Sequence, residues 1–136
     1  MLNCVFKRGR EAANGIDYGL SLRNHKGQLR AIKPEVLFGD PEEVKAVVRT
    51  MECAQRYTAG VFAFAEKSLP QKIKLKIISE HLRISFPGLD PARIAVTYIE
   101  HGDEGFVELH YWIANIDLQS GKRLNAYFDR ADRGRL

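Results

Sequence analysis

Three side chains that commonly bind metal ions lie within one short stretch of this sequence: His101, Glu108 and His110. The stretch over residues 97–112 has the pattern of two strands joined by a glycine-containing turn. Successive side chains of a strand point to opposite faces, so Glu108, His110 and Trp112 share one face, and residues 107, 109, 111 and 113 share the other. If residues 102–105 form the connection, His101 pairs opposite Phe106 and joins that face, one step from Glu108. The spacing therefore predicts two imidazoles and a carboxylate converging on one side of a hairpin.

These three side chains suggest a site for a divalent cation with open coordination positions. Imidazole and carboxylate ligands together suit such a cation, which can act as a Lewis acid on a phosphoryl oxygen. A second interpretation stays open, since exposed strands often carry His and Glu, and a histidine on a sheet face is usually only hydrogen-bonded. Trp112 lies on the same predicted face, where it either stacks on a nucleic-acid base or shields the metal.

Length and composition predict a single soluble domain over residues 1–136. A chain of 136 residues can bury a real core, and 45% hydrophobic with 28% charged residues is typical of globular proteins. No apolar run approaches the roughly 20 residues that cross a bilayer, so no membrane insertion is expected. The first residues do not form a secretory signal, and Cys4 and Cys53 lack a CxxC spacing. We therefore expect free thiols and a cytoplasmic location.

The net charge of +4 is compatible with an anionic partner but does not require one. Basic residues gather at residues 7–10, 23–33, 122–123 and 130–135. Clustered charge is usually just a solvated face, so charge alone leaves nucleic-acid binding as one interpretation among others.

The predicted elements alternate strands with two helices. Asp40 is a good N-cap and Pro41 suits the first helical position, which predicts a helix with an apolar stripe over residues 44–51. Ser68 to Gln71 resembles a capping box that opens a second amphipathic helix, ended by Pro87 and Gly88. Strands are predicted over residues 3–7, 58–65, 93–101 and 106–117. Residues 29–38 form either an edge strand or an extended loop, and glycines limit residues 16–22 to one or two helical turns.

This order of elements predicts an α+β fold, an antiparallel β-sheet with helices packed on one face. The other face of the sheet would then be free to bind a ligand. His81 falls within the second helix and is predicted to be structural, and His25 is predicted to be an exposed loop residue without a role.

Six short motifs, each weak alone, follow one another in an order that is fairly specific. They cover residues 3–10, 16–20 with Tyr18, 39–42, 57–64, His101 with 108–110, and 120–127. In this order the chain resembles the N-terminal relaxase domain of plasmid mobilisation proteins, which are members of the HUH endonuclease superfamily. The similarity runs through nearly the whole chain and implies a relaxase-like fold.

The resemblance implies a metal-dependent, site- and strand-specific DNA nickase and strand transferase that opens a plasmid transfer origin. A tyrosine hydroxyl in such enzymes attacks the scissile phosphodiester and leaves a 5′-phosphotyrosine, and Tyr18 matches that nucleophile. The cation held by His101, Glu108 and His110 would neutralise the phosphoryl oxygens. The implied partners are single-stranded DNA at the transfer origin, an accessory mobilisation protein and a coupling protein. The residues expected to bind DNA are Arg8, Arg10, Arg23, Lys26, Trp112, Lys122 and Arg123.

The chain departs from this branch of the family at its third ligand, where His110 stands in place of the usual asparagine. An additional imidazole favours manganese over magnesium, and the choice between the two stays open. Relaxase domains generally run further than 136 residues, so a fragment or shortened form is one interpretation. Two alternative functions also remain: a rolling-circle replication initiator of the same superfamily, and a non-catalytic module that binds single-stranded nucleic acid with salt-dependent affinity.

Overall fold

The computed structural model describes the backbone of residues 2–9 and, with their side chains, residues 11–102 and 105–126. Arg10 and Tyr127 lie outside the described residues, as does the side chain of Arg8. The described strands form one antiparallel sheet in the order β1-β3-β5-β4-β2. They are β1 (Leu2–Gly9), β2 (Glu35–Gly39), β3 (Tyr57–Ala63), β4 (Val96–His101) and β5 (Glu108–Ala114). Three helices connect them: α1 (Ala13–Leu20), α2 (Pro41–Thr50) and α3 (Gln71–Ser85).

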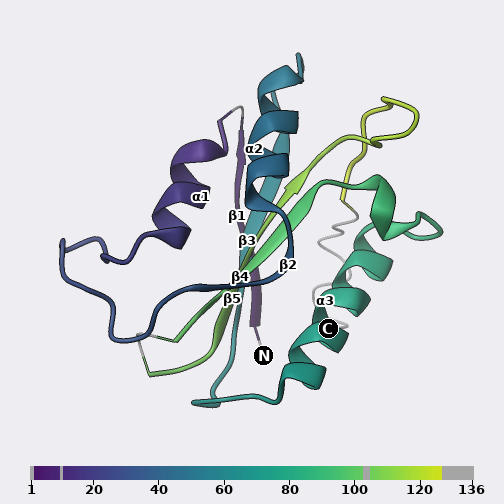
Figure 1. The fold of residues 1–136 in the computed structure, drawn as a ribbon. Helices are drawn as coiled ribbons and strands as arrows, with labels where there is room; N and C mark the ends of the chain where they lie inside the picture. The colour runs from purple at the N-terminus through teal and green to yellow at the C-terminus, as the bar shows by residue number, and fades with distance from the viewer. Residues whose placement is uncertain (1, 10, 103–104, 127–136) are drawn as a thin grey trace.

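The helices cover both faces of the sheet, as Figure 1 shows with the sheet between α3 and the pair α1 and α2. The α+β class with an antiparallel sheet is confirmed, but the prediction that helices pack on one face is wrong. The reason lies in β4 and β5, which carry large apolar side chains on both faces. Tyr98 and Tyr111 pack beneath α3, while Ile99 and Trp112 pack beneath α1 and α2. Each face therefore needs its own cover.

The two longer helices begin in different ways. The side chain of Asp40 accepts a hydrogen bond from the backbone N–H of Glu42 at 2.9 Å, and Pro41 is the first residue of α2, as predicted. The predicted capping box over residues 68–71 is wrong, because α3 begins only at Gln71 and has no side-chain cap. The carbonyl of Pro70 instead accepts the first helical hydrogen bonds, from the N–H groups of residues 73 and 74.

The segments that left two interpretations open are now settled. Residues 35–39 form an edge strand, β2, which pairs only with β4 among the described strands. The predicted helical turns are part of α1, which starts three residues earlier than expected and spans 8 residues despite its glycines. Within the described residues, no helix combines the length and the apolar character needed to cross a membrane.

Candidate metal centre

The three predicted ligands converge where β4 meets β5. His101 pairs directly opposite Glu108, and His110 lies two residues further along β5 on the same face. One potential ligand atom from each residue lies within 4.8 Å of the others. The imidazole centroids of His101 and His110 are 4.3 Å apart, and Nε2 of His110 lies 3.5 Å from Oε1 of Glu108. The predicted grouping of two imidazoles and a carboxylate on one sheet face is confirmed.

The connection between β4 and β5 is longer than predicted, so the pairing of His101 with Phe106 is wrong. Val107 does not continue the β4 ladder. Its N–H donates to the carbonyl of Glu66 and its carbonyl accepts from the N–H of Phe64, both at 3.0 Å. The chain that follows β3 therefore holds residue 107, and Glu108 becomes the first residue opposite His101. The shift is by two residues, which keeps every side chain on its predicted face.

One nitrogen at this site fits a metal ligand because it is buried and makes no hydrogen bond to the described residues. Nε2 of His110 is buried and has no hydrogen-bond partner among the described residues. A buried polar atom without a partner costs about 1–3 kcal/mol, which a bound cation would offset. The donor set of two imidazoles and one carboxylate also leaves coordination positions open for a substrate.

His101 is oriented by a carbonyl from α1. Its Nε2 lies 2.7 Å from the carbonyl oxygen of Gly19, and its side chain is buried. A carbonyl only accepts, so Nε2 carries the proton and donates it, and Nδ1 is the unprotonated nitrogen of the neutral ring. Histidines that bind metals commonly donate their second nitrogen to a backbone carbonyl in this way. The residues present therefore fit a divalent cation.

α1 reaches His101 because two glycines let it lie directly on Trp112. A Cβ on Gly19 would stand 2.9 Å from Cη2 of the indole, and one on Gly15 would stand 3.2 Å from its Nε1. Trp112 is consequently only 7% exposed, and its ring stacks beside that of His110 with centroids 6.4 Å apart. This position fits the shielding alternative. Stacking on a nucleic-acid base would require α1 to move away.

An ion pair joins the outer sides of α1 and α2. Nζ of Lys45 lies 2.8 Å from a carboxylate oxygen of Asp17 and 2.8 Å from one of Glu42. The hydrogen bond to Asp17, followed by the one to Glu42, raises the pKa of Lys45. Since Asp17 is well exposed, the pair orients α1 more than it stabilises the fold.

Tyr18 lies at the same end of α1 as the carbonyl that holds His101. It precedes Gly19, and its side chain is 44% exposed. The guanidinium of Arg30 covers its ring, with Cζ 5.1 Å from the ring centroid. Tyr18 is thus the residue before the carbonyl that contacts His101, and its side chain is accessible from solvent.

The residues expected to bind DNA fall into two separate regions. Arg23 and Lys26 are exposed in the loop after α1, and this loop reaches the β4–β5 connection, where Ile32 lies beside Gly102. Two further cations, Lys122 and Arg123, are exposed in the turn after β5, at the opposite end of the sheet (Figure 1).

A buried carboxylate builds the turn that carries those two cations. Asp117 accepts hydrogen bonds from the guanidinium of Arg93, from the hydroxyl of Ser120 at 2.8 Å and from the N–H of Gln119 at 3.0 Å. The Arg93 guanidinium holds the pKa of Asp117 well below its usual range. The turn is therefore fixed from within, away from the metal centre.

The remaining histidines of the described chain have no part in the cluster. His25 is exposed in the loop after α1, as predicted. His81 is a packing residue of α3, also as predicted: its Nδ1 lies 2.7 Å from the Tyr98 hydroxyl, and its ring contacts Phe62 and Tyr111. Burial lowers the pKa of His81 to about 4, so this imidazole is neutral at pH 7.

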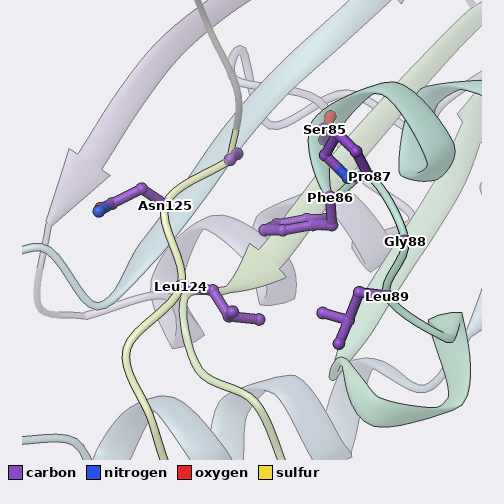
Figure 2. A pocket seen from close by; sticks show the side chains of 8 residues that line it. Ser85, Phe86, Pro87, Gly88, Leu89, Leu124 and Asn125 are labelled. Atoms are coloured by element: carbon purple, nitrogen blue, oxygen red, sulfur yellow. The ribbon is translucent and has the colours of Figure 1, made fainter.

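A hollow of about 540 Å³ lies far from this chemistry, between the end of α3 and residues 124–126 (Figure 2). Phe86, Leu89 and Leu124 point into it. The described residues that line it include no histidine, carboxylate or cysteine.

Sequence reasoning missed two contributors to the centre, Arg30 and the Gly19 carbonyl. The spacing of Gly15 and Gly19 was a usable signal, because residues four apart lie on one face of a helix. Arg30 left no comparable signal, since its contacts depend on how the loop folds back.

The comparisons with known proteins agree with the resemblance drawn from the sequence motifs. The chain is 40% identical over 131 residues to the DNA relaxase MbeA of Escherichia coli. The aligned region covers 95% of this chain and 24% of that protein. The chain is homologous to a plasmid relaxase domain. It is also 37% identical, over 137 aligned positions, to cryptic plasmid protein C of Neisseria gonorrhoeae, covering 100% of this chain and 64% of that protein. No family model matches the chain, and no solved structure matches it.

The resemblance to plasmid mobilisation relaxases is thereby confirmed. The chain spans about a quarter of MbeA and just under two thirds of the gonococcal protein. The activity and partners of those longer proteins therefore enter only as proposals for this chain.

Proposed function

We propose that this chain is the metal-dependent nicking and strand-transfer domain of a plasmid relaxase, with Tyr18 as its nucleophile. The single observation that carries the proposal is an exposed tyrosine that directly precedes Gly19, whose carbonyl contacts His101 of the His-Glu-His cluster, in a homologue of a DNA relaxase. The proposed substrate is single-stranded DNA at a plasmid transfer origin, and the proposed place of action is the cytoplasm.

The proposed reaction is a transesterification. The Tyr18 oxygen forms a bond to the scissile phosphorus, and the bond from phosphorus to the 3′ oxygen breaks. The phenol loses its proton and the leaving oxygen takes one up, which gives a 5′-phosphotyrosine and a free 3′-hydroxyl. The phosphodiester is exchanged for a phosphotyrosine ester and is not hydrolysed, so the same site can rejoin the strand.

Each residue of the centre has a defined part in this proposal. His101, Glu108 and His110 would hold a divalent cation, manganese or magnesium, which supplies Lewis-acid polarisation of the phosphoryl oxygens when bound. The Gly19 carbonyl keeps His101 in one tautomer and one orientation. Trp112 keeps bulk water from the inner side of the cluster, because α1 seals it.

Arg23 and Lys26 are the proposed contacts to the DNA backbone nearest the centre. Both follow Tyr18 in the loop after α1, and neither forms an ion pair among the described contacts. Backbone contacts of this kind position the strand without reading its sequence. Lys122 and Arg123 remain predicted contacts, as do Arg8 and Arg10. An accessory mobilisation protein and a coupling protein remain proposed partners.

The test is a covalent adduct. The protein is incubated with Mn²⁺ and single-stranded oligonucleotides tiled across a candidate transfer origin, then analysed by denaturing gel and by mass spectrometry of tyrosine peptides. The proposal expects a DNA-linked peptide that contains Tyr18 and that is absent in Tyr18→Phe. Tyr57→Phe, which removes a buried hydroxyl from β3, is the matched control and should keep the adduct.

Two other outcomes would replace the proposal. An adduct on another tyrosine would move the nucleophile. Salt-dependent binding of every oligonucleotide with no adduct would favour the non-catalytic binding module.

A further inference from the structure

The C-terminal end of α1 is capped by a cation from outside the helix. α1 has no basic residue in its last turn, so nothing within the helix offsets the negative end of its dipole. Arg30 supplies that charge: its Nε donates to the carbonyl of Ser21 at 2.9 Å, and its Nη2 donates to the carbonyl of Tyr18 at 3.3 Å. The backbone of the proposed nucleophile is thus held by a residue 12 positions later.

The same guanidinium also covers the side chain of Tyr18. Its Cζ lies 5.1 Å from the ring centroid, inside the distance of about 6 Å at which a cation is attracted to an aromatic face. The Tyr18 side chain is 44% exposed, so part of it contacts solvent and not other side chains. Arg30 therefore contacts both the backbone and the ring of a residue that is otherwise weakly restrained.

The loop that carries Arg30 is built to return to this point. The N–H of Arg30 donates to the carbonyl of Leu22 at 2.8 Å, which closes the loop. At its tip, the side chain of Asn24 accepts from the N–H groups of Lys26 and Gln28 at 2.9 and 3.1 Å. Gly27 has φ +77°, a backbone conformation that favours glycine. The loop is thus ordered by its own hydrogen bonds and presents Arg30 in a fixed place.

We propose that Arg30 is a positioning residue that holds the Tyr18 side chain in one orientation at the metal centre. The catalytic consequence rests on the proposed function of Tyr18, whereas the restraint itself is a property of the free protein. A nucleophile that is already aligned loses less freedom on reaching the transition state. Arginine suits this task because its planar fork bonds two carbonyls and covers a ring at once, which a lysine ammonium does not.

The first test needs neither DNA nor metal. Tyrosine rings are labelled with ¹³C, the Tyr18 signal is identified by its loss in Tyr18→Phe, and its ring order parameter is measured by relaxation. In Arg30→Gln we expect this order parameter to fall toward about 0.6, the upper limit of flexible sites. Lys33→Gln removes one charge from the same exposed segment and is the matched control. A Tyr18 ring equally ordered in Arg30→Gln and in the parent would overturn the proposal.

The second test uses the oligonucleotide and Mn²⁺ of the adduct assay. At saturating DNA we expect Arg30→Gln to form the adduct about 10-fold more slowly, with a DNA affinity within about 3-fold of the parent. Arg30→Lys should resemble Arg30→Gln rather than the parent. Full rescue by lysine, or a loss that lies entirely in DNA affinity, would show a plain phosphate contact and overturn the positioning role. If the parent forms no adduct, the proposed function fails and the ring measurement alone decides on Arg30.

Discussion

His81 of α3 lies on one face of the sheet and His110 of β5 lies on the other, and the environments of these two imidazoles differ in one respect. Beneath α3, Nδ1 of His81 shares a hydrogen bond with the Tyr98 hydroxyl at 2.7 Å, and burial raises the pKa of that hydroxyl. On the other face, Nε2 of His110 is equally hidden from solvent but has no hydrogen-bond partner among the described residues. Burial alone therefore does not identify a ligand. The informative feature is a buried nitrogen that makes no hydrogen bond to the described residues.

The largest expected effect is a difference in Mn²⁺ affinity between substitutions on the two faces. His110→Ala should weaken Mn²⁺ binding more than about 100-fold. Loss of a hydrogen-bond partner of a ligand lowers metal affinity by about 10–100-fold, and loss of the ligand itself should lower it further. His81→Ala should leave Mn²⁺ affinity unchanged. Isothermal titration of both variants with Mn²⁺ provides the measurement. An unchanged affinity in His110→Ala would remove this residue from the site.

Stability should show the reverse order. His81→Ala removes ring contacts with Phe62 and Tyr111 and leaves the Tyr98 hydroxyl buried without its partner. We expect a loss of about 2–3 kcal/mol in the free energy of unfolding, measured by urea denaturation without metal. His110→Ala should cost less, since it relieves an unpartnered nitrogen. If the two variants were equally unstable, the contrast between the faces would not hold.

The pH dependence sharpens the contrast further. Burial lowers the pKa of His81 to about 4 from 6.5, so between these values the unfolded chain binds a proton that the folded chain does not. Stability from this group is therefore fully present above pH 6.5 and is lost as pH falls toward 4, by about 3 kcal/mol in total. His81→Gln, which can still bond the Tyr98 hydroxyl but does not titrate, should show a flatter profile of unfolding free energy. Identical slopes for parent and variant would exclude His81 as the source.

The smallest effect concerns the helix that seals the metal face. Gly19→Ala places a Cβ against Trp112 and should shift α1, which weakens the carbonyl contact to His101 and reduces Mn²⁺ affinity about 10-fold. Gly15→Ala meets the indole at a longer distance and is the matched variant, with a smaller expected loss. Both gain about 0.5–1 kcal/mol of helix propensity, so a difference between them reports the contact with Trp112. Equal Mn²⁺ affinities in the two variants would contradict this account.

The sequence predicted the parts of the centre that depend on local rules. Glu108 and His110 are on one face because strand side chains alternate, and α2 begins at Asp40 because a short polar side chain caps it. The hairpin register was not predictable from the hairpin alone, since Val107 is held by the chain after β3.

Two further features depended on distant packing. The glycines that disfavour an isolated helix over residues 13–20 are the residues that let α1 pack on Trp112. The apolar side chains on both faces of β4 and β5 require a cover on each face, but which helix covers which face depends on where the connecting segments cross. Tyr18 was predicted as the nucleophile from its motif, whereas its contact with Arg30 required the folded loop.

The hydrogen bond between the Gly19 carbonyl and His101 joins positions that are 82 residues apart. The residues of α1 are synthesised early, and those of β5 are synthesised near the end of the described chain. β5 lies between β3 and β4 in the sheet. A nascent chain that has completed α3 already contains Tyr18 but none of the three proposed ligands. The order of synthesis therefore keeps the tyrosine and the ligand cluster apart until β5 has emerged and joined the sheet.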